Sequence, residues 1–140
     1  RPIAEFQGLQ WMLADMSTQI EAARALIWRA AGTAGQNGNP FPDSLAAAQA
    51  KIFASEMAIK VTTDALQVFG ARGYSRNYPM ERIQRDARMF TIGGGTAQIL
   101  RTVVASRLLD RKLPQTRDGH AKLAERDAAT AATLKSQAAE

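Results

Sequence analysis

The stretch R85-D-A-R-M-F-T-I-G-G-G-T-A-Q-I-L-R101 decides how the chain is built. Its charged first part ends a helix, three consecutive glycines follow at positions 93–95, and Thr96 opens a second, apolar helix. Glycines let a backbone approach a ligand closely and adopt conformations closed to other residues. Because threonine is a good N-cap, the new helix begins with unpaired N–H groups that point back over the glycines. Such a turn suits an anion or a polarised carbonyl, and the alternative is a flexible connection between two packed helices.

The chain before this turn predicts a loop and then a short charged helix. Residues 70–78 (G-A-R-G-Y-S-R-N-Y) have the composition of a loop. Pro79 is a natural first residue for a helix that runs to about Phe90. Glu81 and Arg85 lie four residues apart on this helix, in the favourable order for an ion pair.

The helix after the turn should run from Thr96 to about Lys112, where Pro114 prevents its continuation. From residue 115 onward the sequence is polar, charged and rich in alanine. Residues 121–138 carry only a thin apolar stripe, which is typical of a frayed or partner-dependent helix.

Two long helices should precede the loop. The first spans about Ala4–Ala31, because its apolar residues recur at alternating steps of three and four, as in a helix packed nearly along its neighbours. Gly32 can end this helix in a left-handed cap, and residues 35–42 form a loop by composition. The seam consists of Phe6, Leu9, Leu13, Met16, Ile20, Ala23, Ile27 and Ala30.

The second long helix begins after a cap at Asp43 or Ser44 and should run to about Phe69, with Gly70 after it. Its apolar surface is broad and its alanines allow close approach, so we expect neighbours on several of its sides. The few charges that interrupt it are Lys51, Glu56, Lys60 and Asp64.

No segment shows convincing strand alternation. Long helices with short connections predict an all-α domain of the antiparallel, up-and-down four-helix-bundle type over residues 1–113, followed by a polar tail, 114–140. Only three of the predicted helices are strong bundle formers. We therefore expect that the tail supplies the missing wall or that the first bundle helix lies upstream of residue 1.

Composition excludes several kinds of site. The chain has 140 residues, a net charge of +5, no cysteine and one histidine, His120 in the polar tail. These counts leave no disulfide framework or thiolate site and argue against a metal centre. We find no run of membrane-spanning length, no signal peptide, no Ser/His/Asp set and no Walker loop.

Five arginines outnumber the two carboxylates, Glu81 and Asp86, between residues 72 and 88. This basic region is suited to holding phosphates, and equally to forming an ion-paired surface. Composition alone favours neither interpretation.

Three ordered segments carry a family resemblance. They are Q67-V-F-G-A-R-G-Y74, Y78-P-M-E-R-I-Q-R-D-A-R88 and I92-G-G-G-T-A-Q-I-L-R101. Together they resemble the C-terminal helical domain of the acyl-CoA dehydrogenases, and R1-P-I-A-E-F-Q-G-L-Q-W-M-L-A-D-M16 is similar to the stretch that follows that family's F-G motif. The resemblance covers about residues 1–113.

The resemblance implies an FAD-dependent enzyme that oxidises an acyl-CoA thioester between its α and β carbons. In this family the first segment approaches the flavin of a neighbouring subunit, although Ala71 stands where a glycine is usual. The N–H of residue 94 would help to polarise the thioester carbonyl, as an oxyanion hole does. By position, the flavin-binding residues are Gln67, Gly70, Ala71, Thr96, Gln98 and Gln7, with Phe6 beside Gln7, and the substrate-binding residues are Gly94 and Gly95.

Gly94 is the important departure, because most members carry the catalytic glutamate at this position. Glycine has no side chain to remove a proton, and Gly93 replaces a common tyrosine. In some branches the glutamate lies on the preceding bundle helix, which would be upstream of Arg1. The resemblance therefore assigns no catalytic residue and no metal ligand to this chain.

Three interpretations remain. The first is an acyl-CoA dehydrogenase domain whose base lies upstream; the second is a base-less assembly subunit of a hetero-oligomer; the third is an unrelated helical module that binds an acidic partner through its arginines. The first implies FAD, a homo- or hetero-oligomer, an acceptor of the electron-transfer flavoprotein type, no nucleic acid, and a bacterial cytoplasm or mitochondrial matrix. For the isolated 140 residues we expect no turnover and little or no FAD binding.

Overall fold

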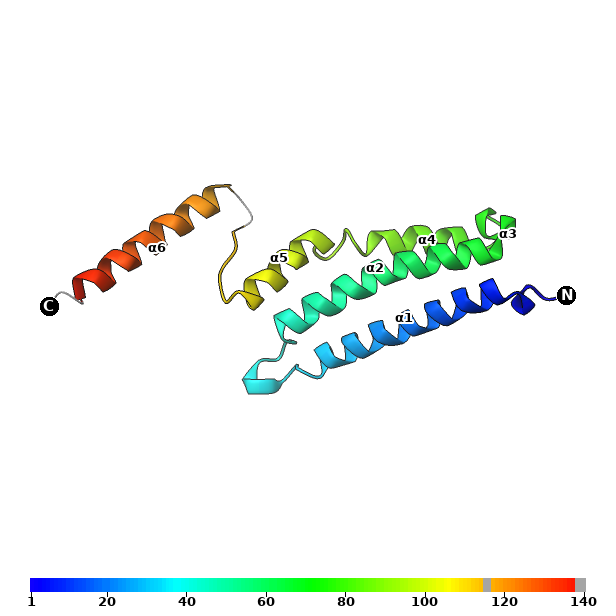
Figure 1. Ribbon diagram of the computed structural model, residues 1–140, viewed down its shortest axis with the longest axis horizontal. Helices are drawn as coiled ribbons and strands as arrows, with labels where there is room; N and C mark the ends of the chain where they lie inside the picture. Colours follow the sequence, from blue (N-terminus) through cyan, green and yellow to red (C-terminus); the bar gives the residue numbers. More distant parts are fainter. Residues whose placement is uncertain (115–116, 138–140) are drawn as a thin grey trace. The chain divides into compact units, whose positions relative to one another are not determined.

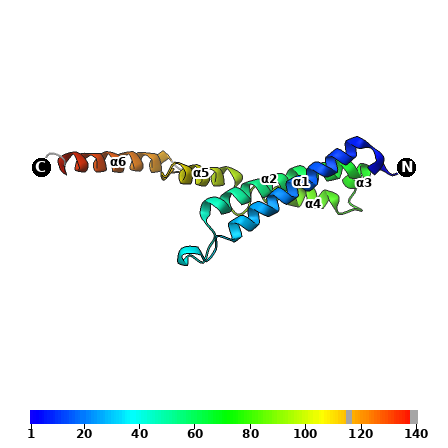
Figure 2. The ribbon, with the colours of Figure 1, turned by 60° about the horizontal axis from the view of Figure 1, so that its bottom comes forward.

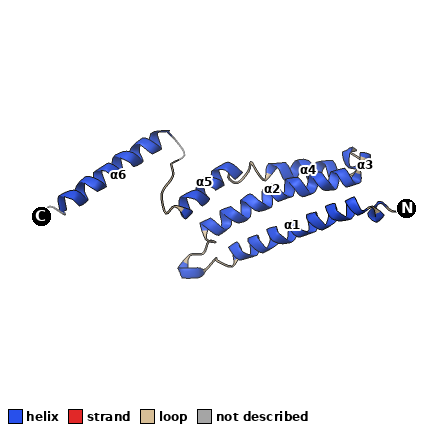
Figure 3. Cartoon of the chain, in the orientation of Figure 1, coloured by secondary structure: helices blue, strands red, loops and turns tan. Residues whose placement is uncertain are grey.

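The computed structural model describes residues 1–114 and 117–137, and in these ranges the chain forms helices and connecting loops without a strand (Figure 3). The prediction of an all-α fold is confirmed. Residues 1–104 and 105–140 form two compact units. Within the described residues, no helix is long and apolar enough to cross a membrane.

The first unit is built on an antiparallel pair of long helices, α1 (Gln7–Ala31) and α2 (Ser44–Phe69), which lie side by side in Figures 1 and 2. The α1 residues buried here follow a seven-residue spacing: Met16, Ala23 and Ala30. Small side chains on α2, Ala48 and Ala50, are buried as well. Small buried residues on both helices therefore contribute to the core of the first unit.

The predicted seam of α1 is only half buried. Leu13, Ile20 and Ile27 remain 47%, 37% and 47% exposed, on the flank of the buried stripe. The bundle is thus formed by α1, α2 and the helices that follow them. The exposed residues Leu13, Ile20 and Ile27 leave an apolar strip along α1 accessible.

The second long helix is the centre of the unit. Helices α1, α3 (Ala71–Tyr74) and α4 (Met80–Met89) all pack against α2, as its broad apolar surface predicts. The N–H of Ala46 donates a hydrogen bond of 2.9 Å to the Asp43 carboxylate, which confirms this residue as the N-cap of α2.

The beginning and end of α1 differ from the prediction. A short 3₁₀ turn, Ile3–Glu5, precedes the helix, and Phe6 in an extended conformation is its N-cap. Gly32 has φ −65°, so the predicted left-handed cap is wrong. The left-handed conformation occurs three residues later, at Gly35, because a further turn of backbone hydrogen bonds continues past Gly32.

Three other bounds also differ. Residues 71–74 of the predicted loop form the short helix α3, and Pro79 is the N-cap of α4 rather than its first residue. Helix α5 (Ala97–Leu108) ends before Lys112, and Asp110 has φ +46°. A left-handed residue breaks the helical hydrogen bonding, so α5 stops before Pro114 can act.

The second unit contains α6 (Arg117–Gln137), which confirms a helix in the tail. It begins four residues before the predicted start at 121, and the predicted end at 138 lies outside the described residues. The guanidinium of Arg111 lies 3.2 Å from the Asp127 carboxylate and links the segment after α5 to α6. The domain boundary at residue 113 stays a prediction.

Candidate functional site

The glycine turn at 93–95 connects α4 to α5 and is held by its own backbone. The carbonyl of Met89 accepts hydrogen bonds from the N–H groups of Ile92 (2.9 Å) and Gly93 (2.8 Å). Gly94 and Gly95 follow in the left-handed region, with φ +67° and +91°. Non-glycine residues are strained there by about 1–2 kcal/mol, so glycine follows this path of the chain at the least cost.

A lysine from α2 closes the turn from the other side. The Lys51 ammonium donates to the carbonyl of Gly93 at 3.0 Å and also to the carbonyl of Phe90, at the end of α4. A cation at this place complements the negative end of the α4 dipole. The sequence interpretation missed this role, although a charge in an alanine-rich part of a central helix was the available signal.

Two backbone donors are left over in this turn. Gly94 and Gly95 are exposed, and their N–H groups have no acceptor among the described residues. A Cβ on Gly94 would have one neighbour within 4 Å, Lys51 Cε at 3.9 Å. The turn is thus open, with bare peptide available to an oxygen acceptor, and is not sealed inside hydrophobic packing.

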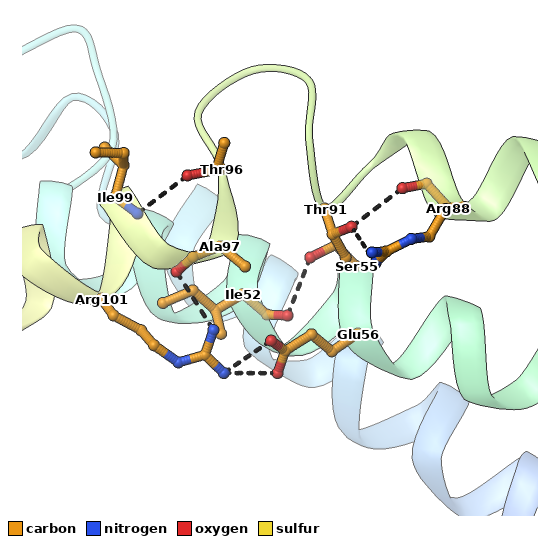
Figure 4. A network of polar contacts seen from close by, with 9 residues as sticks. All are labelled: Ile52, Ser55, Glu56, Arg88, Thr91, Thr96, Ala97, Ile99 and Arg101. Carbon is orange, nitrogen blue, oxygen red and sulfur yellow. Dashed lines mark hydrogen bonds and ion pairs between the residues drawn. The ribbon is translucent and has the colours of Figure 1, made fainter.

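Thr96 caps α5, because its Oγ1 accepts the N–H of Ile99 at 3.2 Å (Figure 4). Thr96 and Gln98 line a hollow of about 300 Å³. Arg88 lines it too and donates to Thr91 Oγ1 at 3.0 Å, while Thr91 is 7% exposed. Glu56 and Ile59 of α2 line the hollow as well, so polar and apolar groups of α2, α4, α5 and the connection between α4 and α5 bound it.

The other predicted flavin residues lie elsewhere. Gln67, Gly70 and Ala71 are exposed at the end of α2 and the start of α3, where Gly70 has φ +59°. Gln67 lies sixteen residues beyond Lys51 on α2, about 24 Å at the rise of an α-helix. Gln7, also exposed, starts α1 at this same end of the helix pair (Figure 1).

The structure therefore divides the predicted residues into two clusters. One contains the glycine turn with Thr96 and Gln98, and the other contains Gln67, Gly70, Ala71 and Gln7. The binding roles themselves stay predictions.

The arginine-rich region is partly engaged within the chain. Arg85 lies 3.6 Å from Glu81, so the predicted ion pair is confirmed. Arg72, Arg76 and Arg82 are exposed. No group of three or more histidine, cysteine or carboxylate side chains among the described residues is arranged to hold a metal.

Comparison with known protein families shows to which family the chain belongs. The family model described as "Acyl-CoA dehydrogenase, C-terminal domain" matches residues 1–109. The chain belongs to the acyl-CoA dehydrogenase family. The resemblance carried by the three sequence segments is thereby confirmed, and with it the assignment of this helical domain to a family of oxidoreductases.

Curated relatives extend this finding. The chain is 67% identical over 125 residues to the 3-sulfinopropanoyl-CoA desulfinase of Advenella mimigardefordensis, covering 89% of this chain and 30% of the relative. It is 45% identical over 109 residues to the cyclohexane-1-carbonyl-CoA dehydrogenase of Geobacter metallireducens, covering 78% and 28%. The chain thus spans about 30% of the length of the curated relatives it matches.

Solved structures agree. Butyryl-CoA dehydrogenase from Megasphaera elsdenii matches with a TM-score of 0.72 and 45% identity, over 78% of this chain and 28% of that one. A glutaryl-coenzyme A dehydrogenase complexed with glutaryl-CoA matches with a TM-score of 0.70 and 34% identity, over 80% and 28%. The helical arrangement is therefore that of this family's C-terminal domain.

The desulfinase match reaches further along the chain than the family model. A match over 125 of 140 residues must include residues 110–125, which lie beyond the end of the family model at residue 109. Similarity to the desulfinase consequently extends into α6.

Proposed function

We propose that the full-length protein is a flavin-dependent acyl-CoA enzyme in which the turn at 93–95 binds the thioester of its substrate. The N–H groups of Gly94 and Gly95 are free and fixed, and such donors stabilise negative charge on a carbonyl oxygen. This open turn is the observation that carries the proposal.

The residues present fit a flavin. Thr96 and Gln98 offer a hydroxyl and an amide at the hollow beside the turn, and the second cluster offers Gln67 and the exposed backbone of Gly70. A Cβ on Gly70 would have no neighbour within 4 Å, so the backbone there is accessible to a large ligand. When bound, FAD would supply the capacity to accept a hydride, which a dehydrogenation requires and a desulfination does not.

For the reaction, we propose desulfination of 3-sulfinopropanoyl-CoA. Four curated relatives with 66–68% identity carry the name 3-sulfinopropanoyl-CoA desulfinase. In the balanced reaction, the bond between the β-carbon and the sulfur breaks, and the β-carbon keeps the electron pair and takes a proton from water. The remaining OH of that water joins the sulfur. The products are propanoyl-CoA and hydrogen sulfite. This overall change removes no α-proton, and Gly94 has no side chain that could remove one.

Dehydrogenation is the second candidate. Relatives with 45–47% identity are named as dehydrogenases, and the family's glutamate would then come from a helix upstream of Arg1. In that case an acceptor of the electron-transfer flavoprotein type is expected. For either reaction we propose an oligomer, in which two subunits complete each flavin site, and a cytoplasmic location.

The two reactions differ in a measurable product. Full-length protein with 3-sulfinopropanoyl-CoA should release sulfite stoichiometrically with propanoyl-CoA and without an electron acceptor. With butanoyl-CoA it should not reduce a redox dye. Dye reduction without sulfite release would favour the dehydrogenase. Turnover of neither substrate by a flavin-loaded protein would favour the base-less assembly subunit.

A further inference from the structure

Lys51 occupies an unusual place for a charged side chain. It projects from α2, is only partly exposed, and its Nζ bonds to the carbonyls of Phe90 and Gly93. The other lysine in this part of α2, Lys60, is exposed and forms an ion pair with Asp64 at 2.6 Å on the same helix. Lys51 is thus engaged with the glycine turn, while Lys60 is engaged only with its own helix.

The bond to Gly93 has a consequence for Gly94. The carbonyl of Gly93 and the N–H of Gly94 belong to the same peptide group, which is planar and trans. The C=O and N–H bonds therefore point in opposite directions, and their dipoles add. When Lys51 holds the carbonyl oxygen at 3.0 Å, it also fixes the N–H of Gly94 to point away from the ammonium.

The charge of Lys51 adds to this effect. Hydrogen bonds in series polarise one another, so a cation on the carbonyl strengthens the N–H of the same peptide as a donor. This matters most at a left-handed glycine, where the backbone has many other conformations to adopt. A second bond, to Phe90, anchors the same ammonium to the end of α4.

We propose that Lys51 is a positioning residue that orients and polarises the 93–94 peptide so that the Gly94 N–H binds the thioester carbonyl. This inference rests on the proposed function, because that function supplies the thioester. Lys51 does not touch the substrate and acts through the peptide group.

The test compares full-length wild type with Lys51→Met, Lys51→Arg and the matched control Lys60→Met. The first readout is the ¹³C resonance of carbonyl-labelled butanoyl-CoA bound to each protein. Wild type and Lys60→Met should move the carbonyl signal downfield from its position in free ligand. Lys51→Met should lose most of this shift, and Lys51→Arg, which can still donate to both carbonyls, should regain part of it.

The second readout is kinetic. With 3-sulfinopropanoyl-CoA, Lys51→Met should raise KM about 5-fold, the effect of one weakened hydrogen bond, and change kcat much less, because cleavage at the β-carbon places no new charge on the thioester carbonyl. A third readout, deuterium uptake by peptides spanning residues 89–98, should rise in Lys51→Met and not in Lys60→Met.

An unchanged carbonyl shift and unchanged uptake in Lys51→Met would overturn the inference. If wild type itself neither shifts the carbonyl signal nor turns over an acyl-CoA, the proposed function fails, and the thioester role of the turn fails with it. Deuterium uptake would then still decide whether Lys51 orders the turn, so the two failures are distinguishable.

Discussion

Glu56 on α2 and Arg101 on α5 form an ion pair in which Nη2 of the arginine lies 2.8 Å from both carboxylate oxygens (Figure 4). The other terminal nitrogen of Arg101 reaches the carbonyl of Ala97, in the first turn of α5, at 3.4 Å. Lys51, one and a half turns before Glu56 on α2, holds the glycine turn. Two side chains of α2 thus fix the turn and the helix that leaves it.

Removing this ion pair should loosen the start of α5 by a small amount. Both side chains are about half exposed, so we expect a coupling free energy of about 0.2–1 kcal/mol between Glu56→Gln and Arg101→Met. A double-mutant cycle on deuterium uptake of residues 97–104 in the full-length protein measures it. The coupling should shrink in 1 M salt, since charges at the surface are screened. A coupling that is zero at low salt would contradict the tie between α2 and α5.

Gly73 and Gly8 should respond oppositely to alanine. A Cβ on Gly73 would lie 2.7 Å from the Leu66 carbonyl oxygen and 2.8 Å from Phe69 Cβ, so Gly73→Ala must displace α3 from α2. We expect a loss of about 1–3 kcal/mol of stability. Gly8, the second residue of α1, has no neighbour within 4 Å of the added atom. Gly8→Ala should gain up to about 1 kcal/mol.

Melting temperatures of the two full-length variants measure this difference. A lower temperature for Gly73→Ala beside an equal or higher one for Gly8→Ala is the expected outcome. Equal melting temperatures would mean that α3 does not pack against α2 as described.

The sequence predicts local events well where one residue decides them. Asp43 and Thr96 both act as N-caps because a short polar side chain can reach a free N–H two or three residues later, whatever surrounds it. Gly32 shows the limit of such predictions, since a glycine can adopt the left-handed conformation of a cap but does not have to. The boundary of α5 was missed for a similar reason, because an aspartate such as Asp110 tolerates the left-handed conformation without requiring it.

The candidate site also has features that the sequence predicts and one that depends on the fold. The open turn follows from its glycines, and its place in a thioester-binding family follows from motif resemblance. The role of Lys51 depends on a contact between residues 51 and 93, and only the packing of α2 beside α4 creates it. A charged residue within a mostly apolar helix indicates that its side chain has a polar partner, but not which residue provides it.

Gln67 should contribute to flavin retention in the full-length protein. We expect Gln67→Ala to weaken FAD binding about 5-fold, the effect of one lost hydrogen bond of about 1 kcal/mol. Flavin absorbance remaining with the protein after dilution and filtration measures this. Gln36→Ala is the matched control, because Gln36 is exposed in the loop between α1 and α2 and bonds to Gly32. Equal retention by both variants and wild type would remove Gln67 from the dinucleotide site.

Gly94→Glu tests whether the turn still marks the family's usual base position. The left-handed φ of +67° strains any side chain by about 1 kcal/mol. Among the described residues, the nearest atom to an added Cβ is Lys51 Cε at 3.9 Å, so residue 94 has room for a Cβ. We expect the variant to exchange the α-protons of butanoyl-CoA with D₂O, to reduce a redox dye with that substrate, and to shift its preference among acyl chain lengths.

Gly94→Ala carries the same backbone strain without a carboxylate and should do none of these. Because the two variants share the strain, exchange in Gly94→Glu alone would trace the gained chemistry to the carboxylate. Absence of exchange in a flavin-loaded Gly94→Glu protein that still binds butanoyl-CoA would mean that residue 94 does not face the α-carbon, and the placement of the thioester against this turn would have to be abandoned.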